Sequence, residues 1–191
     1  YAPWVNQIHF ITWGHLPEWL NTECPKLHIV NHRDYIPEEY LPTFSSHPIE
    51  LNLHRIPNLS EHFVYFCDDM LLNNAVTPDF FFRKGKPCDF LQCRHIHFAS
   101  ANDIYAHITT NDVMEINRHY SYIKTFLLHP WKIMSRNYGV SICLKNILKL
   151  GNVHRFVGFQ NHHLPTSYIK QTFLDVWSAM PERMDKVSGN R

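Results

Sequence analysis

The order of hydrophobic and polar residues predicts a strand-rich first half of the chain and a helical second half. Runs rich in β-branched and aromatic residues predict four strands, at residues 7–13, 27–31, 63–66 and 89–97. The run at 63–66 has no polar alternation, which is typical of a strand buried on both faces. The stretch 95–98 alternates histidine with an apolar residue, as a half-buried strand does.

Helical spacing of apolar residues dominates after Asn111 and occurs once before it. Four helices are expected in the second half, at residues 112–120, 122–134, 140–150 and 166–180. An earlier helix is expected from Pro48 to Pro57, because proline suits a first helical turn and ends a later one. Its apolar residues recur on one face, so His54 and Arg55 are expected to point away from that face. These elements predict an α/β fold in which helices cover a sheet.

The composition fits one globular domain, strand-rich over 1–98 and mainly helical over 99–191. The 191 residues are 45% hydrophobic and 18% charged, which allows a substantial core and gives no sign of disorder. No apolar run is long enough to span a bilayer, and no signal-peptide pattern follows Tyr1. The net charge is +1, and Lys and Arg form no basic stripe, so composition gives no basis for a nucleic-acid partner.

The cysteines and histidines show no regular metal framework. Five irregularly spaced cysteines predict a reducing compartment rather than disulfides. The spacing of Cys88, Cys93, His95 and His97 is not a common structural zinc pattern, so zinc is disfavoured there. The fifteen histidines are scattered, and they are expected to raise the net charge below about pH 6.5.

Two adjacent carboxylates, Asp68 and Asp69, follow the strand predicted at 63–66. Ligands of open α/β sheets collect outside the carboxyl ends of strands, and hard oxygen ligands suit magnesium or manganese bridging to phosphate. The alternative is a simple turn, since aspartate is common at strand exits and Asn73 and Asn74 follow closely.

A series of short motifs in the first eighty residues occurs in the order found in one known family. The motifs are Ala2-Pro3-Trp4-Val5, Leu16-Pro17-Glu18-Trp19-Leu20, His32-Arg33-Asp34, Leu41-Pro42-Thr43-Phe44-Ser45-Ser46, Ile49-Glu50, His54-Arg55-Ile56-Pro57, Leu59-Ser60-Glu61 and Asp68-Asp69. This segment resembles the second conserved region of the Stealth family of sugar-phosphate transferases. A later segment, with His163-Leu164-Pro165, Pro181-Glu182 and Asp185, resembles the third conserved region, while residues 88–157 match only loosely.

The resemblance implies transfer of a hexose- or N-acetylhexosamine-1-phosphate from a nucleotide-diphosphate sugar to a glycan hydroxyl, forming a phosphodiester. It favours UDP-N-acetylhexosamine as donor, a cell-surface polysaccharide as acceptor and Mg²⁺ or Mn²⁺ as cofactor. A cytoplasmic location is expected, and peripheral association with the inner face of the membrane is allowed.

The fold that the resemblance implies is a single catalytic domain with a Rossmann-like core sheet and a helical C-terminal half. We expect this domain to be incomplete at both ends. The family's first conserved region is not found, and a functional arginine of the third region is expected just after Arg191.

The resemblance also suggests catalytic roles for three residues. Asp68 and Asp69 would bind the metal or organise phosphate, offsetting the charge that develops on phosphate oxygens. His163 would take the proton of the acceptor hydroxyl, or would attack phosphorus itself and form a phosphohistidine.

Further residues are candidates for substrate binding. Arg55, with its neighbour His54, would bind pyrophosphate or pair with the aspartates. The alternative for Arg55 is a solvated arginine beside Glu50 or Glu61. Ser45 and Ser46 would hold an anion at a helix start or merely cap the helix. Arg136 and Lys132 could also reach phosphate.

One departure from the family pattern is Cys67, which stands where the family usually has asparagine. A thiol cannot replace an amide as hydrogen-bond donor and acceptor, so donor preference or activity is expected to change. Two other functions stay open at this point. One is a metal-dependent glycosyltransferase, and the other is a non-catalytic fragment that binds nucleotide sugar or glycan.

Overall fold

The computed structural model describes residues 1–149 and 155–189, which form two compact units. The first unit joins Tyr1–Cys88 to the C-terminal segment from Pro165, and the second is Asp89–Leu164. The described residues contain three two-stranded sheets together with helices, which confirms a mixed α/β fold with a helical second half. No Rossmann-like sheet is present in these described ranges. The single catalytic domain stays a prediction, and Arg191 lies outside the described residues.

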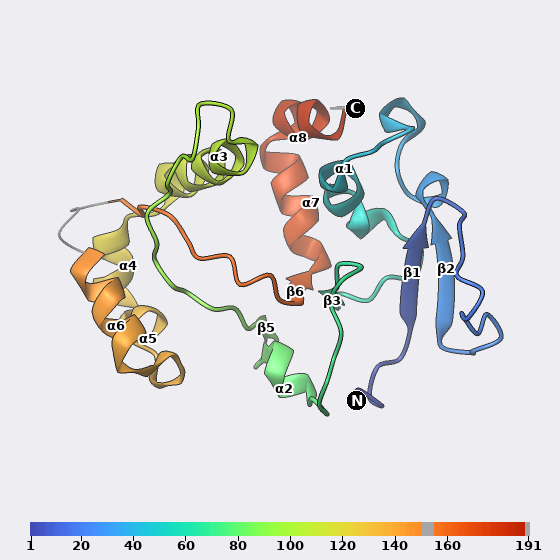
Figure 1. Cartoon of the computed structure of the whole chain (residues 1–191), viewed down its shortest axis with the longest axis horizontal. Coiled ribbons are helices and arrows are strands. Elements are labelled where there is room, and N and C mark those ends of the chain that lie inside the picture. The colour runs from blue at the N-terminus through green and yellow to red at the C-terminus, as the bar shows by residue number, and fades with distance from the viewer. Residues whose placement is uncertain (150–154, 190–191) are drawn as a thin grey trace. The chain divides into compact units, whose positions relative to one another are not determined.

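A parallel strand pair forms one edge of the first unit. β1 (Ile8–Thr12) pairs with β2 (Leu27–Asn31) over five residues, as Figure 1 shows. Both strands were predicted from their sequence pattern, and both are confirmed. Since parallel strands point the same way, the residues that follow them lie at a common edge.

A second, antiparallel pair ties the end of the chain to its middle. β3 (His62–Tyr65) pairs with β6 (Thr166–Ile169), so that Tyr65 lies opposite Thr166. The strand predicted at 63–66 is confirmed within one residue, although most of it is half-buried rather than fully buried. The helix predicted at 166–180 is wrong over its first four residues, because these pair with the backbone of β3. The helix α7 begins only at Lys170.

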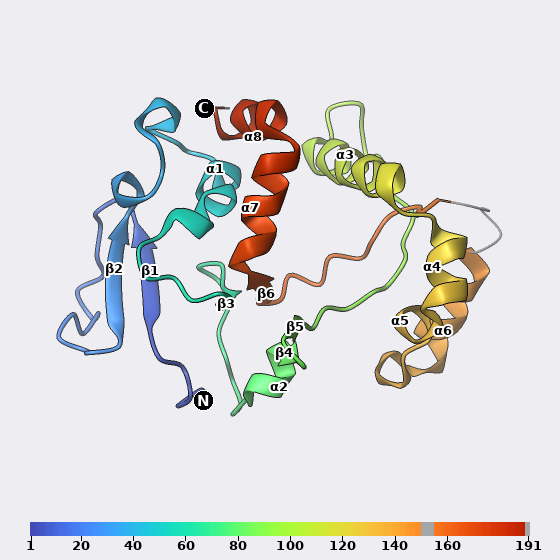
Figure 2. The ribbon, with the colours of Figure 1, turned by 180° about the vertical axis from the view of Figure 1, so that it is seen from behind.

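Helices pack against these strands in the first unit. They are α1 (Ser46–Leu51), α2 (Pro78–Phe81), α7 (Lys170–Ala179) and α8 (Pro181–Ser188), with short 3-10 turns at His32–Asp34, Glu38–Tyr40 and Leu53–Arg55, and the strands β4 (Phe82–Arg83) and β5 (Lys86–Pro87) complete the unit. Figure 2 shows α7 and α8 beside α1. The Tyr40 hydroxyl donates to Asp185 at 2.6 Å, and the Trp177 indole donates to the Leu51 carbonyl at 2.9 Å, so both helices are anchored to the first half of the chain.

The second unit is helical. Its helices are α3 (Ile104–His119), α4 (Tyr122–Leu128), α5 (Pro130–Ile133) and α6 (Gly139–Leu148). α3 begins eight residues before the predicted start, because the Asp103 side chain caps it by accepting from the Ala106 amide at 2.9 Å. The helix predicted at 122–134 is divided at Pro130, whose ring cannot continue α4. The helix predicted at 140–150 is confirmed to Leu148, and Leu150 lies outside the described residues.

The strand predicted at 89–97 is wrong. Only an isolated bridge joins Cys93 to Phe159, and side-chain amides replace the missing ladder. The fully buried Asn146 accepts from the Cys93 amide at 2.9 Å and donates to the carbonyls of Leu91 and Ile133, each at 3.0 Å. Extended backbone is therefore stabilised here by one short bridge and by the Asn146 side chain instead of a longer strand ladder, since buried N–H and C=O groups need partners of any kind.

Asn146→Ala should destabilise the second unit strongly. The change leaves one buried amide and two buried carbonyls without their partner, and each unsatisfied group costs about 1–3 kcal/mol. We expect a loss of at least about 3 kcal/mol in the free energy of unfolding, measured by urea denaturation. Asn137→Ala, at an exposed asparagine of the same unit, is the control. Equal stability of the two variants would contradict this account of the unit.

Candidate active site

The two aspartates lie where the sequence placed them, just after β3. Asp68 and Asp69 are exposed, in a turn closed by a hydrogen bond from the Met70 amide to the Cys67 carbonyl at 3.2 Å. The turn that was the alternative for this strand end is therefore present, and the carboxylates within it are exposed.

A third carboxylate joins this end of β3 from helix α1. The Tyr65 hydroxyl donates to Glu50 at 3.3 Å, and burial together with the Glu50 charge raises the pKa of Tyr65. Burial also raises the pKa of the Cys67 thiol, and the charges of Glu50, Asp69 and Asp68 act in the same direction. The Cys67 sulfur lies within 4.8 Å of a carboxylate oxygen of Asp69. The site is therefore electronegative, and its cysteine stays protonated at neutral pH.

These oxygen groups fit a hard divalent cation. Asp68 and Asp69 offer exposed carboxylates of the kind that bind Mg²⁺ or Mn²⁺, whereas the protonated Cys67 thiol is a poor ligand for either ion. The negative potential that acts on Cys67 would favour any cation held there. The magnesium or manganese site stays a prediction that suits the residues present.

The neighbouring basic residues are engaged in packing. His54 is buried, with its ring 5.9 Å from those of Phe173 and Trp177, so the expectation that it points away from the apolar face is wrong. The reason is that residues 53–55 form a 3-10 turn, whose tighter winding rotates side chains relative to an α-helix. Arg55 is exposed and places its guanidinium 4.9 Å from the centre of the Trp177 ring. A role of either residue in substrate binding stays a prediction.

Ser45 is the N-cap of helix α1. Its hydroxyl accepts from the His47 amide at 3.4 Å and lies 3.0 Å from the His47 ring, while Ser46 is the exposed first residue of the helix. The capping alternative is therefore confirmed for Ser45. Substrate binding by either serine stays a prediction.

The remaining predicted site residues belong to the second unit. His163 is exposed, has a left-handed backbone with φ of 49°, and donates its amide proton to Asn161 at 2.8 Å. This left-handed conformation is uncommon for a residue other than glycine. Arg136 begins a 3-10 turn and Lys132 lies in α5, both exposed. Their proposed roles in catalysis or phosphate binding stay predictions.

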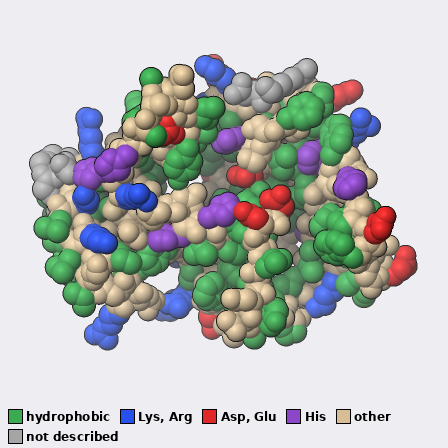
Figure 3. All heavy atoms as spheres, in the orientation of Figure 1, with side chains coloured by type: hydrophobic (Ala, Val, Ile, Leu, Met, Phe, Trp, Pro, Cys, Tyr) green, Lys and Arg blue, Asp and Glu red, His purple; other side chains and the backbone are tan. Residues whose placement is uncertain are grey.

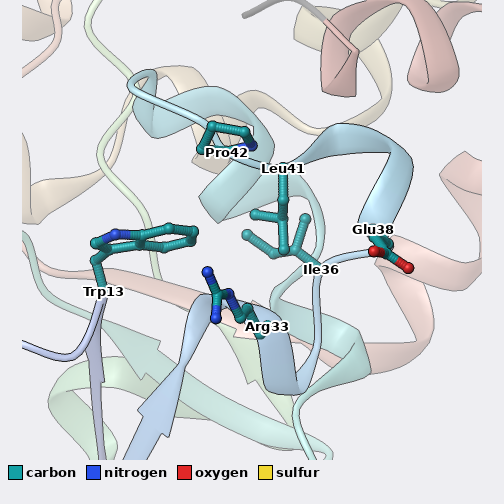
Figure 4. A pocket seen from close by; sticks show the side chains of 6 residues that line it. All are labelled: Trp13, Arg33, Ile36, Glu38, Leu41 and Pro42. Atoms are coloured by element: carbon teal, nitrogen blue, oxygen red, sulfur yellow. The ribbon is translucent and has the colours of Figure 1, made fainter.

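The structure adds a pocket that the sequence analysis did not identify. It lies in the first unit, at the edge where β1 and β2 end, and has a volume of about 650 Å³. Its lining residues are Trp13, Arg33, Ile36, Glu38, Leu41 and Pro42 (Figure 4). The Arg33 guanidinium lies 5.0 Å from the centre of the Trp13 ring, so an aromatic face and a positive charge meet at one point.

Local sequence explains how these two side chains are placed. After β1 the chain turns at Gly14, whose φ of 113° suits glycine, and the Gly14 amide donates to the Thr12 hydroxyl at 3.2 Å. After β2, Asn31 and Asp34 form a reciprocal capping box that fixes the turn containing Arg33. A capping signal in His32-Arg33-Asp34, next to a predicted strand end, could have indicated this position.

Comparison with known proteins identifies the region that holds both features. Residues 1–89 match Stealth protein CR2, conserved region 2. The chain carries the second conserved region of the Stealth family. This Stealth region contains the Asp68-Asp69 pair, Glu50 and the pocket at Trp13 and Arg33, which places both candidate sites within the family's own segment.

Three curated relatives align along the entire chain. The capsular polysaccharide phosphotransferase WcwK of Streptococcus pneumoniae is 39% identical over 191 residues, all of this chain and 56% of the relative. The exopolysaccharide phosphotransferase cps2G of Lactiplantibacillus plantarum is 39% identical over 196 residues, again 100% of this chain and 56% of the relative. The receptor polysaccharide phosphotransferase WefC of Streptococcus gordonii is 37% identical over 194 residues, with the same coverage of 100% and 56%. The chain therefore spans little more than half the length of these relatives.

The buried His54 should make stability fall in mild acid. Burial, aided by the Arg55 charge, lowers the pKa of His54 from 6.5 to about 4. Below pH 6.5 His54 therefore becomes protonated in the unfolded chain but stays neutral in the folded chain. The free energy of unfolding falls as the pH is lowered towards 4. Between pH 7 and pH 4.5, the wild type should lose on the order of 2 kcal/mol more unfolding free energy than His54→Leu, measured by urea denaturation. Parallel pH profiles of the two proteins would contradict a neutral buried histidine.

Proposed function

We propose that this Stealth chain is the core of an enzyme that transfers a sugar-1-phosphate from a nucleotide-diphosphate sugar to a hydroxyl of a capsular polysaccharide or exopolysaccharide. The observation that carries this proposal is the alignment of the entire chain with relatives named as polysaccharide phosphotransferases, at 37–39% identity. The electronegative end of β3 and the pocket at the end of β1 and β2 supply the kinds of group that such a reaction needs.

The donor nucleotide would bind in the pocket of Trp13 and Arg33. An exposed indole offers a face on which a base can stack, and a guanidinium beside it suits a phosphate oxygen. The position, at the carboxyl ends of two parallel strands, is the usual place for ligands in α/β folds. A Rossmann-like core remains part of the proposal, and the parallel pair is compatible with it because all-parallel sheets are typical of α/β proteins. The donor proposed is UDP-N-acetylhexosamine.

Asp68 and Asp69 would hold Mg²⁺ or Mn²⁺, with Glu50 adding negative potential from α1. The cation would offset charge on the oxygens of the transferred phosphate. Tyr65 positions Glu50 through its hydroxyl, so these two residues act by shaping the site rather than by touching the reacting atoms.

The general base proposed is His163, which is close in sequence to the strand that pairs with β3. Tyr65 of β3 pairs with Thr166 of β6. Asp68 is three residues after Tyr65, and His163 is three residues before Thr166. Three extended residues span at most about 10 Å, which limits how far either side chain can lie from that residue pair. In the reaction, the acceptor oxygen bonds to the β-phosphorus, its proton passes to the His163 imidazole, and the bond from that phosphorus to the nucleoside monophosphate breaks. The products are a phosphodiester and UMP.

A cytoplasmic site at the inner face of the membrane is part of the proposal. No helix in the described ranges has the length and apolar character to cross a bilayer. Helix α6 exposes Val140, Leu144 and Leu148, which are spaced four residues apart and so share one face, with Lys145 beside them. An apolar helix face bordered by lysine suits the surface of an anionic membrane, on which a lipid-linked acceptor would be presented.

Removing a site carboxylate or the base should abolish turnover. With UDP-N-acetylglucosamine, Mg²⁺ and a capsular glycan acceptor, we expect UMP release to fall at least about a hundredfold in Asp69→Ala and in His163→Ala, because each loses charge stabilisation or proton transfer. Chromatographic separation of released nucleotides measures this change. Asp79→Asn, an exposed carboxylate at the start of α2, is the control.

The same assay distinguishes the other functions. Release of UDP instead of UMP would indicate attack at the anomeric carbon, hence a glycosyltransferase. Turnover that is the same in the wild type and in both variants would rule out the catalytic roles proposed. Donor binding without any turnover in the wild type would favour the non-catalytic fragment.

Trimming the aromatic face of the pocket should weaken donor binding more than turnover. We expect Trp13→Ala to raise the KM for the donor about tenfold, since base stacking on an aromatic ring contributes about 1–3 kcal/mol. Trp13→Phe keeps an aromatic face and should retain most of the affinity. Trp19→Ala, an indole that is 79% exposed and outside the pocket, is the control. An unchanged KM in Trp13→Ala would exclude this pocket as the donor site.

A further inference from the structure

A second pocket lies wholly within the helical unit, and its lining is basic. The volume is about 420 Å³. The lining residues are Gln92, Cys93, Arg94, His95, His97, Lys145, Lys149 and Gln160. Three permanent cations and two histidines therefore surround one cavity, and the lining contains no carboxylate.

Two of the three cations, Lys145 and Lys149, have no acidic residue near them along the chain. No Asp or Glu occurs between Glu115 and Asp175, a stretch that contains eight Lys and Arg residues. Over α4–α6, Figure 3 shows blue and green side chains with no red among them. The net charge of +1 for the whole chain conceals this local excess. Positive charges that line a concave surface repel one another and create a strong positive potential there. A bound anion reduces that repulsion.

The backbone around the pocket is held firmly. The amides of Arg94 and Gln160 donate to the carbonyls of Gly158 and Gln92 at 3.0 and 2.9 Å. Gly158 has a φ of 141°, and a Cβ at this position would meet the Arg94 carbonyl oxygen, so only glycine allows this approach. The Gln160 side chain accepts a hydrogen bond from the Arg94 guanidinium at 2.5 Å. Arg94 is thus oriented before any ligand arrives, while helix α6 supplies Lys145 and the C-cap residue of the helix is Lys149.

We propose that this pocket binds the phosphate group of a phosphorylated ligand. Guanidinium and ammonium groups are the standard protein partners of phosphate oxygens, and the two glutamine amides can bind an attached hydroxyl or sugar oxygen. The volume suits a phosphate with one sugar ring, at the lower end of the range for small-molecule sites. The phosphate can come from a sugar phosphate of the glycan or from a lipid headgroup. The site itself does not depend on the proposed function, because binding needs no turnover.

Calorimetric titration of the full chain tests this proposal without any assay of activity. The probes are glucose-1-phosphate and UMP, with glucose as the neutral control, and sedimentation with phosphatidylglycerol vesicles provides a lipid probe. We expect glucose-1-phosphate to bind with an affinity that falls as salt is added, and glucose not to bind. The double variant Lys145→Gln, Lys149→Gln should weaken binding at least tenfold, and Lys149→Arg should retain it.

Matched controls separate the pocket from general charge and from misfolding. Lys124→Gln removes an exposed cation of α4 that does not line the pocket, and it should bind glucose-1-phosphate as the wild type does. A melting temperature of the double variant equal to that of the wild type would show that the fold is kept. Binding to vesicles but not to glucose-1-phosphate or UMP would assign the phosphate to a lipid headgroup. An equal loss of glucose-1-phosphate affinity in Lys124→Gln and in the double variant would overturn the proposal. Failure of every phosphate probe to bind the wild type would overturn it as well. Loss of UMP release bears on the proposed function and not on this site.

Discussion

The pairing of β3 with β6 is the interaction on which the first unit depends. Four residue pairs join segments about one hundred positions apart, and loop closure over that length is costly in entropy. The cost is offset because the pairing brings α7 and α8 back to the first half of the chain. The Trp177 indole then donates a hydrogen bond to the Leu51 carbonyl, and Asp185 accepts a hydrogen bond from the Tyr40 hydroxyl. The same pairing fixes the direction in which the chain leaves β3 towards Asp68 and Asp69.

Elements set by local sequence were predictable, and elements set by distant partners were not. The strands at 7–13 and 27–31 carry enough β-branched and aromatic residues to be identified alone. Residues 166–169, Thr-Ser-Tyr-Ile, form too short a run to be separated from the helical pattern that follows, and the pairing with β3 makes them a strand. The stretch 89–97 shows the opposite error, because its alternation suggested a strand while Asn146, more than fifty positions away, supplies the hydrogen bonds.

In the candidate site, too, features set by local sequence were predicted and features set by distant contacts were not. Asp68, Asp69 and the cap at Ser45 follow from their immediate neighbours in sequence. Glu50 enters the site only through its contact with Tyr65, and Trp13 meets Arg33 only because two strands run parallel. His54 was misplaced because a 3-10 turn, which periodicity does not reveal, changes the direction of its side chain. The basic pocket was overlooked because Arg94 and the pair Lys145 and Lys149 lie about fifty positions apart, so they form no basic stripe in the sequence.

The raised pKa of Cys67 has a consequence for the chemistry that this site admits. Thiolate, not thiol, is the form that oxidants and alkylating agents attack, and burial, with the nearby carboxylate charges acting in the same direction, raises the pKa of Cys67 and favours its thiol form. All five cysteines of the chain are free, and at the one beside the aspartates burial and negative charge both disfavour the reactive thiolate. An exposed, readily ionised cysteine beside two aspartates would be a site of oxidative damage. Here burial and the negative potential that would suit a cation both lower the reactivity of the sulfur.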